Sequence, residues 1–276
     1  MTILFDGRFS ITPNFSLYSR IERHPPAHAY PPVPAGEAGS YEIVPDPLSS
    51  GQPVAKITMR SGTPGRCEIR PLARDIMAAG PDYGELWYAW WDLFPADWVD
   101  EIPGVVDPES NLYSSTKNII SQVHGVSDMG DLAHSPQFAI YVEGRRLKFF
   151  KTYDTTLLTT TAAPNLTIHG SWPLVRMVWI EWVLHVNWAA SSNGFIHLYK
   201  DRRLAYSQTG TPTAYHSTNP TGGPYFKCGF YQYSGWLSPA TRVRYSKGVV
   251  IGDNTSSYLE VTGHSALEAA TIRRIS

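Results

Sequence analysis

Residues 194–206 read "GFIHLYKDRRLAY", and this stretch indicates the fold class. Apolar and polar side chains alternate on both sides of the pair Lys200-Asp201, as in two strands joined by a tight turn. Ten further segments are rich in β-branched and aromatic residues and are divided by turn residues. They cover residues 41–46, 54–61, 66–73, 86–94, 117–125, 137–144, 145–153, 179–188, 225–233 and 241–252.

Helical periodicity is nearly absent from the chain. Short helices are expected only at residues 71–77 and 266–275, and the proline-rich stretch 24–38 is expected to be an irregular surface excursion. About a dozen short strands with so little helix predict an all-β fold, either a two-sheet sandwich or a barrel. No repeat or linker divides the sequence, so we expect one domain over residues 1–276.

The amino-acid composition limits the classes of molecule that the protein is expected to bind. Aromatic residues make up 13% of the chain, with 9 Trp and 16 Tyr, which suits both β-structure and stacking on sugar rings. The net charge of −1 gives no overall basic field for nucleic acid or an anionic membrane, although a local basic cleft is compatible with it. The two cysteines, Cys67 and Cys228, lie within strand patterns and are expected to be small buried residues without a disulfide.

The N-terminal sequence lacks a signal peptide, and no segment is long enough to span a bilayer. We therefore expect a soluble protein that acts outside the cell as a virion component, after lysis, or as a mature secreted form.

Three of the predicted strands carry polar residues at every second position, which places those residues on one face. Apolar residues such as Ile69, Val123 and Phe226 occupy the opposite face. The polar positions are Arg66, Glu68 and Arg70 in the first strand, Gln122 and His124 in the second, and Tyr225, Lys227, Gly229, Tyr231 and Tyr233 in the third. If the three strands are neighbours, they line a groove with cations, an amide, an imidazole and phenols, and Gly229 leaves a gap for a substrate.

These motifs resemble the Arg-x-Glu-Leu-Arg, Gln-Ile-His and Tyr-Phe-Lys-x-Gly-x-Tyr elements of jelly-roll polysaccharide lyases of the alginate-lyase kind. The flanking sequences are similar to those of the heparinase-I and glucuronan-lyase group. They read "ELWYAWWDLFPADWV" (85–99), "IISQVHGVSD" (119–128) and "WIEWVLHVNWAASSNGFIHLYKDRRLAY" (179–206). The resemblance spans residues 57–233 and implies a β-jelly-roll, concanavalin-like sandwich of two sheets.

The resemblance also implies a reaction, the β-elimination of an acidic, uronic-acid polysaccharide. Arg66 and Gln122 would neutralise the substrate carboxylate, His124 would take the C5 proton, and Tyr231 would protonate the leaving oxygen. In a syn elimination Tyr231 would serve as both base and acid. Substrate-binding positions would be Arg70, Lys227, Tyr225, Tyr233 and Glu68, with Glu68 orienting an arginine rather than reacting. No cofactor is expected, and a structural calcium site stays open.

Two other functions remain compatible with the sequence. A glycan-binding module on the same sandwich would keep the aromatic residues without turnover. A concanavalin-like glycoside hydrolase would need two carboxylates facing each other across a cleft, and no such run is present; Asp97, Asp100 and Glu101 lie in a proline-flanked turn. A phage or bacterial depolymerase of capsule or exopolysaccharide would be a lyase and, in a phage, also a structural component. The sequence does not name the sugar.

Overall fold

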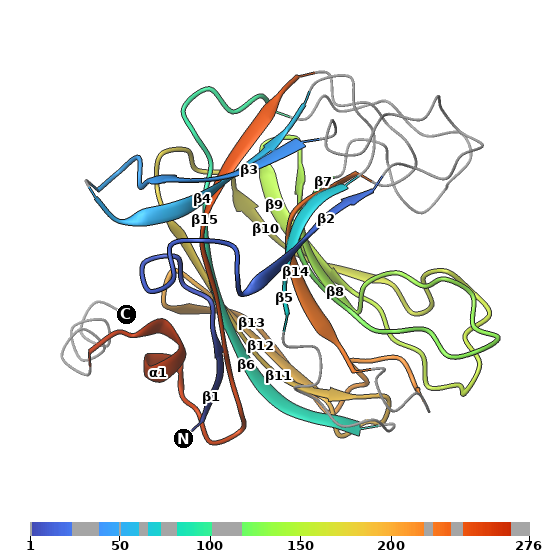
Figure 1. The fold of residues 1–276 in the computed structure, drawn as a ribbon. Helices are drawn as coiled ribbons and strands as arrows, with labels where there is room; N and C mark the ends of the chain where they lie inside the picture. Colours follow the sequence, from blue (N-terminus) through green and yellow to red (C-terminus); the bar gives the residue numbers. More distant parts are fainter. Residues whose placement is uncertain are drawn as a thin grey trace.

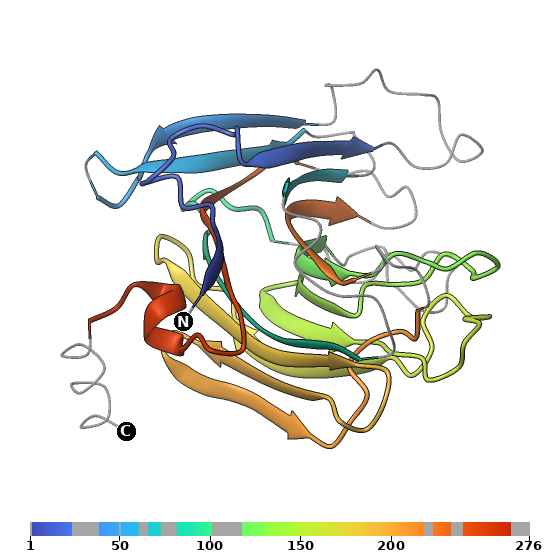
Figure 2. The same cartoon turned by 60° about the horizontal axis from the view of Figure 1, so that its bottom comes forward.

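The computed structural model describes residues 2–23, 39–49, 51–60, 66–72, 82–100, 118–217, 223–232 and 240–265. Within these residues the chain forms two antiparallel sheets that pack face to face, as Figures 1 and 2 show. The predicted all-β sandwich is confirmed. The described part contains one short helix, α1 (Tyr258–Thr262), and no helix long and apolar enough to cross a membrane.

Sheet A has the strand order β13-β12-β11-β6-β15-β4-β3, and β1 also pairs with β15. Its strands are β1 (Ile3–Asp6), β3 (Gly39–Pro45), β4 (Pro53–Met59), β6 (Asp82–Leu93), β11 (Ile180–Ala189), β12 (Phe195–Lys200), β13 (Arg203–Thr209) and β15 (Arg242–Gly252).

Sheet B has the strand order β10-β9-β8-β7-β14-β5-β2. Its strands are β2 (Tyr18–Arg23), β5 (Arg66–Pro71), β7 (Asn118–His124), β8 (Phe138–Glu143), β9 (Arg146–Lys151), β10 (Thr167–Pro173) and β14 (Tyr225–Gln232). The three strands with polar faces, β7, β14 and β5, are therefore neighbours in the middle of this sheet.

The main core lies between the two sheets and is rich in large aromatic rings. Trp90 and Trp182 of sheet A stack at 6.4 Å, and Trp90 also contacts Phe226 of sheet B at 5.1 Å. Cys67 and Cys228 are buried, free thiols in this core, as expected. Because the alternate residues of β5 and β14 fill the core, their polar neighbours point to the opposite face of sheet B.

All twelve predicted strand segments are strands, but β1, β2 and β10 were not predicted. β10 has mostly exposed side chains and a break in its pairing with β9, so it lacks the alternation that reveals a strand. Of the expected helix at 71–77, Pro71 belongs to β5 and residues 73–77 lie outside the described residues. The stretches 24–38 and 266–275 also lie outside them.

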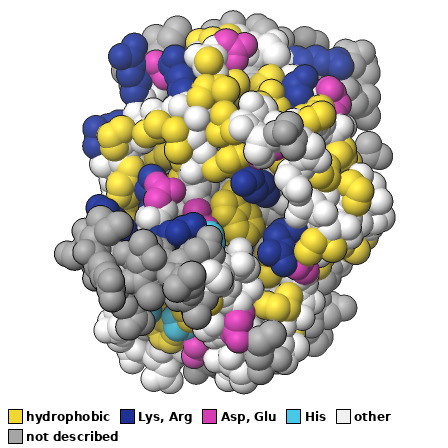
Figure 3. Space-filling view, turned by 90° about the vertical axis from the view of Figure 1, so that its left-hand side faces the viewer, with side chains coloured by type: hydrophobic (Ala, Val, Ile, Leu, Met, Phe, Trp, Pro, Cys, Tyr) yellow, Lys and Arg dark blue, Asp and Glu magenta, His cyan; other side chains and the backbone are white. Residues whose placement is uncertain are grey.

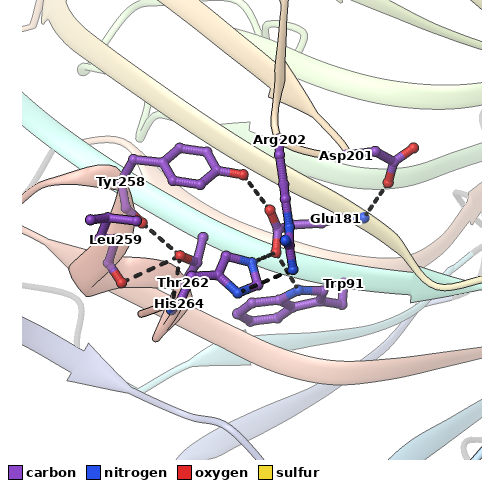
Figure 4. Close-up of polar contacts among 8 residues, drawn as sticks. All are labelled: Trp91, Glu181, Asp201, Arg202, Tyr258, Leu259, Thr262 and His264. Carbon is purple, nitrogen blue, oxygen red and sulfur yellow. Dashed lines mark hydrogen bonds and ion pairs between the residues drawn. The ribbon is translucent and has the colours of Figure 1, made fainter. Parts of the chain in front are cut away.

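Helix α1 packs on the outer face of sheet A, where Val261 contacts a small cluster that includes Trp91 and Val250. Figure 4 shows how Glu181 of β11 holds this region. Its carboxylate accepts hydrogen bonds from Trp91 Nε1 at 3.2 Å, from His264 Nε2 at 2.6 Å and from the Tyr258 hydroxyl. A buried carboxylate with three donors fixes the helix against the sheet.

Candidate active site

The register of the strands arranges the predicted site residues along β14. Tyr225 is opposite His124, Lys227 is opposite Gln122, and Tyr231 is opposite Arg66. His124 and Tyr231 thus stand at opposite ends of a row, with Gln122 and Lys227 between them.

A cavity of about 270 Å³ opens over this row. We call it the groove. Its lining includes five of the predicted residues, Arg66, His124, Tyr225, Lys227 and Tyr231, together with loop residues such as His134 and Pro136. Gln122 and Glu68 are fully buried beside it. Tyr233 lies outside the described residues.

The surroundings of His124 fix its protonation state. Its Nδ1 lies 2.5 Å from the carbonyl oxygen of Gly125. Because a carbonyl oxygen only accepts, Nδ1 carries the proton and Nε2 keeps its lone pair. Burial, reinforced by the positive charge of Lys227, lowers the pKa of His124 to about 3. The imidazole is therefore neutral over the whole physiological range, with a lone pair on Nε2.

Glu68 joins two other site residues below the groove. Its carboxylate pairs with Arg66 Nε at 2.8 Å and accepts a hydrogen bond from Gln122 Nε2. Burial alone would lower the pKa of Arg66, but Glu68 and Tyr231 keep it above its usual value. These contacts support the interpretation of Glu68 as an orienting residue, since both of its partners are held in fixed positions.

The cations of the groove contact its tyrosine rings. The guanidinium carbon of Arg66 lies 3.9 Å from the centroid of the Tyr231 ring. Tyr225 lies between two cations, with Lys227 Nζ at 5.3 Å and the Arg70 guanidinium carbon at 5.4 Å from its centroid. Arg70 is not among the residues lining the cavity, and its Nε lies 3.3 Å from Ser19 Oγ. Arg66 and Lys227 are therefore the cations that face the groove.

Gly229 has a different role from the one expected. Its φ is +146°, and a Cβ there would lie 2.2 Å from the carbonyl oxygen of Cys67 and 2.6 Å from Cα of Glu68. The space beside Gly229 is thus filled by the backbone of β5 and is not a gap for a substrate. Glycine is required because β5 approaches closely at a bulge in β14.

Sequence reasoning missed His134, which lies in the loop before β8. Its ring stacks on Tyr215 at 3.9 Å and lies 5.4 Å from the His124 ring. Burial lowers its pKa, and its closeness also helps to keep His124 neutral. The surrounding sequence, "DLAHSPQF" (131–138), has no periodic pattern that would place this histidine near the groove.

An ion pair inside the core, between Asp92 of β6 and Arg244 of β15, was also not predicted from the sequence. Both side chains are fully buried. Arg244 Nη1 donates to the carbonyl oxygens of Ile120 and Gly229, the latter at 3.0 Å. These carbonyls belong to irregular points of β7 and β14, where an extra residue interrupts the ladder. One guanidinium from sheet A therefore supports two strands of the groove from below.

Solved structures with the same fold are known. An endo-β-1,4-glucuronan lyase from the fungus Trichoderma reesei aligns with a TM-score of 0.61 and 15% identity, over 90% of this chain and 98% of that one. A marine alginate lyase from Aplysia kurodai aligns with a TM-score of 0.51 and 10% identity, over 89% of this chain and 94% of that one. An alginate lyase from Chlorella virus aligns with a TM-score of 0.51 and 9% identity, over 79% of this chain and 90% of that one. No curated protein matches the chain.

The model of the family described as polysaccharide lyase matches residues 12–250, which include every strand of the groove. This match agrees with the resemblance of the three motif strands and with the observed two-sheet sandwich. The chain, with its groove on sheet B, therefore belongs to the polysaccharide lyase family, and it shares its jelly-roll fold with a glucuronan lyase and with alginate lyases.

Proposed function

We propose that this lyase cleaves a uronic-acid polysaccharide by β-elimination in the groove of sheet B. The observation that carries the proposal is one cavity lined by a neutral histidine, a tyrosine and two cations. A neutral base, a phenolic acid and positive charge are what removal of a proton next to a carboxylate requires.

The first task is to neutralise the substrate carboxylate. The C5 proton of a uronic acid becomes acidic enough only when its neighbouring carboxylate is held by donors or cations. Arg66 and Lys227, which both line the groove, supply positive charge. Gln122, buried beside the groove and held by Glu68, would supply an amide next to them. Glu68 also keeps Arg66 in place, so this part of the site is organised before the substrate arrives.

The second task is the proton transfer. His124 Nε2 takes the C5 proton, and the electron pair of that bond forms the C4–C5 double bond. The C4–O4 bond breaks, and O4 leaves with a proton from the Tyr231 hydroxyl. Atoms and charges balance, because the imidazolium and the phenolate formed in the step return to their starting states through solvent. In a syn elimination Tyr231 would take the proton as well as give it.

The substrate class is supported by the structures that share the fold, which are a glucuronan lyase and alginate lyases. Both are named for polymers of uronic acids. We therefore propose an acidic polysaccharide of this class as substrate, with no cofactor, and an extracellular role in breaking down a capsule or exopolysaccharide.

A screen of uronic-acid polysaccharides tests the proposal. Glucuronan, alginate and a heparin-like chain would each be incubated with the enzyme while two products are measured, the ultraviolet absorbance of unsaturated uronyl ends and new reducing ends. Elimination gives one unsaturated end for each new reducing end. Reducing ends without absorbance would indicate a hydrolase, and binding without either product would indicate a glycan-binding module.

A further inference from the structure

A second hollow region lies on the outer face of sheet A, on the other side of the core from the groove. It consists of two adjoining cavities of about 250 and 270 Å³ that share Trp91, Lys247 and His264. We call the pair the outer hollow. Figure 3 shows this side of the molecule, where hydrophobic side chains near the centre are bordered by Lys and Arg side chains.

Part of the outer hollow is built from residues outside the family match at 12–250. Arg8 and Ser10 come before that range, whereas Thr262 and His264 come after it, and all four line the hollow. Helix α1 brings the latter two into place through the contacts of Glu181 seen in Figure 4. The outer hollow is therefore built in part from residues on either side of the family match.

The carboxylates around the outer hollow are already engaged by donors of the protein. Asp46 accepts hydrogen bonds from Trp179 Nε1 at 3.0 and 3.1 Å and from the backbone N–H of Leu48 at 2.8 Å. Glu181 has the three donors described above. Asp201 accepts the backbone N–H of Glu181 at 3.0 Å and pairs with Lys200. The acidic side chains therefore have little capacity left for a ligand.

One cation of the hollow, Lys247, is in the opposite situation. Lys247 Nζ lies 4.5 Å from the centroid of a Trp179 ring, and no described residue accepts a hydrogen bond from it. Burial lowers the pKa of Lys247, although Asp46 and Glu181 oppose that effect. Arg202 Nη2 donates at 3.4 Å to His264 Nδ1. A partly buried ammonium without an acceptor, next to an indole face, is suited to binding an anion.

We propose that the outer hollow is a second, non-catalytic binding site for a carboxylate-bearing sugar unit. Trp91 and Trp179 would contact the apolar face of the sugar ring, while Lys247 and Arg202 would bind its carboxylate. The choice of a uronate as ligand rests on the proposed function. A polymer held here and in the groove would bind more tightly than at either site alone, because the second contact is intramolecular.

Calorimetric titration with a glucuronate tetrasaccharide, and separately with a mannuronate tetrasaccharide, tests the site. The protein carries Tyr231→Phe so that the ligand is not cleaved. The test variant adds Lys247→Met, and Arg202→Met provides a second variant if the first does not fold. The matched control adds Lys56→Met, which removes a lysine of the same sheet that pairs with Glu42 at 3.7 Å and is not among the residues lining the hollow. A carboxyl-reduced tetrasaccharide serves as the uncharged ligand.

We expect two bound tetrasaccharides per chain with Lys56→Met but one with Lys247→Met. Loss of a charge-assisted hydrogen bond weakens affinity roughly 10- to 100-fold. The carboxyl-reduced tetrasaccharide should bind the outer hollow with a similar loss of affinity, relative to the charged tetrasaccharides. Equal stoichiometry and affinity in Lys247→Met and Lys56→Met, with both tetrasaccharides, would overturn the proposal.

The two proposals fail separately. The yield of unsaturated ends reports on the groove alone, and Lys247→Met in the otherwise native enzyme should leave turnover of a tetrasaccharide unchanged. Binding that depends on Lys247 would support the outer hollow even if no polymer gave unsaturated ends.

Discussion

The two outward faces of the sandwich carry similar residues in different electrostatic surroundings. On the outer face of sheet A, His185 pairs with Glu85 at 2.7 Å, and His264 and Tyr258 both bind Glu181. In the groove of sheet B, His124 bonds to a backbone carbonyl, and the charged groups that act on it are Lys227, Arg66 and His134. Burial lowers the pKa of both His124 and His185; Lys227 reinforces that effect at His124, whereas Glu85 opposes it at His185.

The largest expected difference in turnover is between two variants that each replace a histidine by glutamine, one on each face. His124→Gln should lower turnover by about 10²–10⁴-fold, because positioned proton transfer contributes that much. His185→Gln should leave turnover unchanged, since the ring stacks on Trp87 at 3.7 Å and faces Glu85, far from the groove. The rate at which each variant forms unsaturated ends measures these changes in turnover. Equal losses of turnover in the two variants would contradict the proposed difference in role between the two faces.

Two of the buried carboxylates, Glu68 and Glu181, provide a smaller contrast. Glu68→Gln should lower kcat/KM by at least about tenfold, because Arg66 and Gln122 lose a charged partner worth about 1.5–3 kcal/mol. Glu181→Gln should instead leave kcat/KM intact and lower the melting temperature, since α1 loses its anchor.

Kinetics and thermal unfolding of both carboxylate variants separate the two roles. A loss of activity in Glu181→Gln at a temperature where it is folded would contradict the assignment.

The next expected effect, a change in the free energy of unfolding with pH, is smaller still for each pH unit. His124 has a folded-state pKa of about 3, against an ordinary value of 6.5. Between these values the unfolded chain binds a proton that the folded chain does not, so stability is full above about pH 6.5 and falls as the pH falls. The slope is at most about 1.4 kcal/mol per pH unit. Urea unfolding of the native protein and of His124→Gln should therefore converge toward low pH. Parallel stability curves between pH 7 and 5 would show that His124 is not held neutral.

Much of the fold follows from local patterns in the sequence. Alternating residues on either side of turn pairs, as in 194–206, predicted the strands, and the shared polar faces of β5, β7 and β14 are consistent with their being neighbours. β10 and α1 were missed because an exposed strand and a five-residue helix carry no periodic apolar signal.

The site was predictable only where its residues share a strand motif. His134 reaches the groove from a loop, and Arg244 supports two strands of the groove through the core from the other sheet. Neither position is fixed by neighbours in sequence; both depend on tertiary packing. The role of Gly229 was misjudged for the same reason, since the close approach of β5 is visible only in three dimensions.

The most direct test of the central claim compares two tyrosines of the same strand. Tyr231→Phe removes one hydroxyl from the proposed acid, and Tyr225→Phe removes one from a ring that contacts Lys227 and Arg70. Turnover of both variants should be measured as unsaturated ends formed on the polymer identified by the screen. We predict that Tyr231→Phe loses about 10²–10⁴-fold in kcat, while Tyr225→Phe changes mainly KM. Near-normal kcat in Tyr231→Phe would contradict the proposed elimination in this groove.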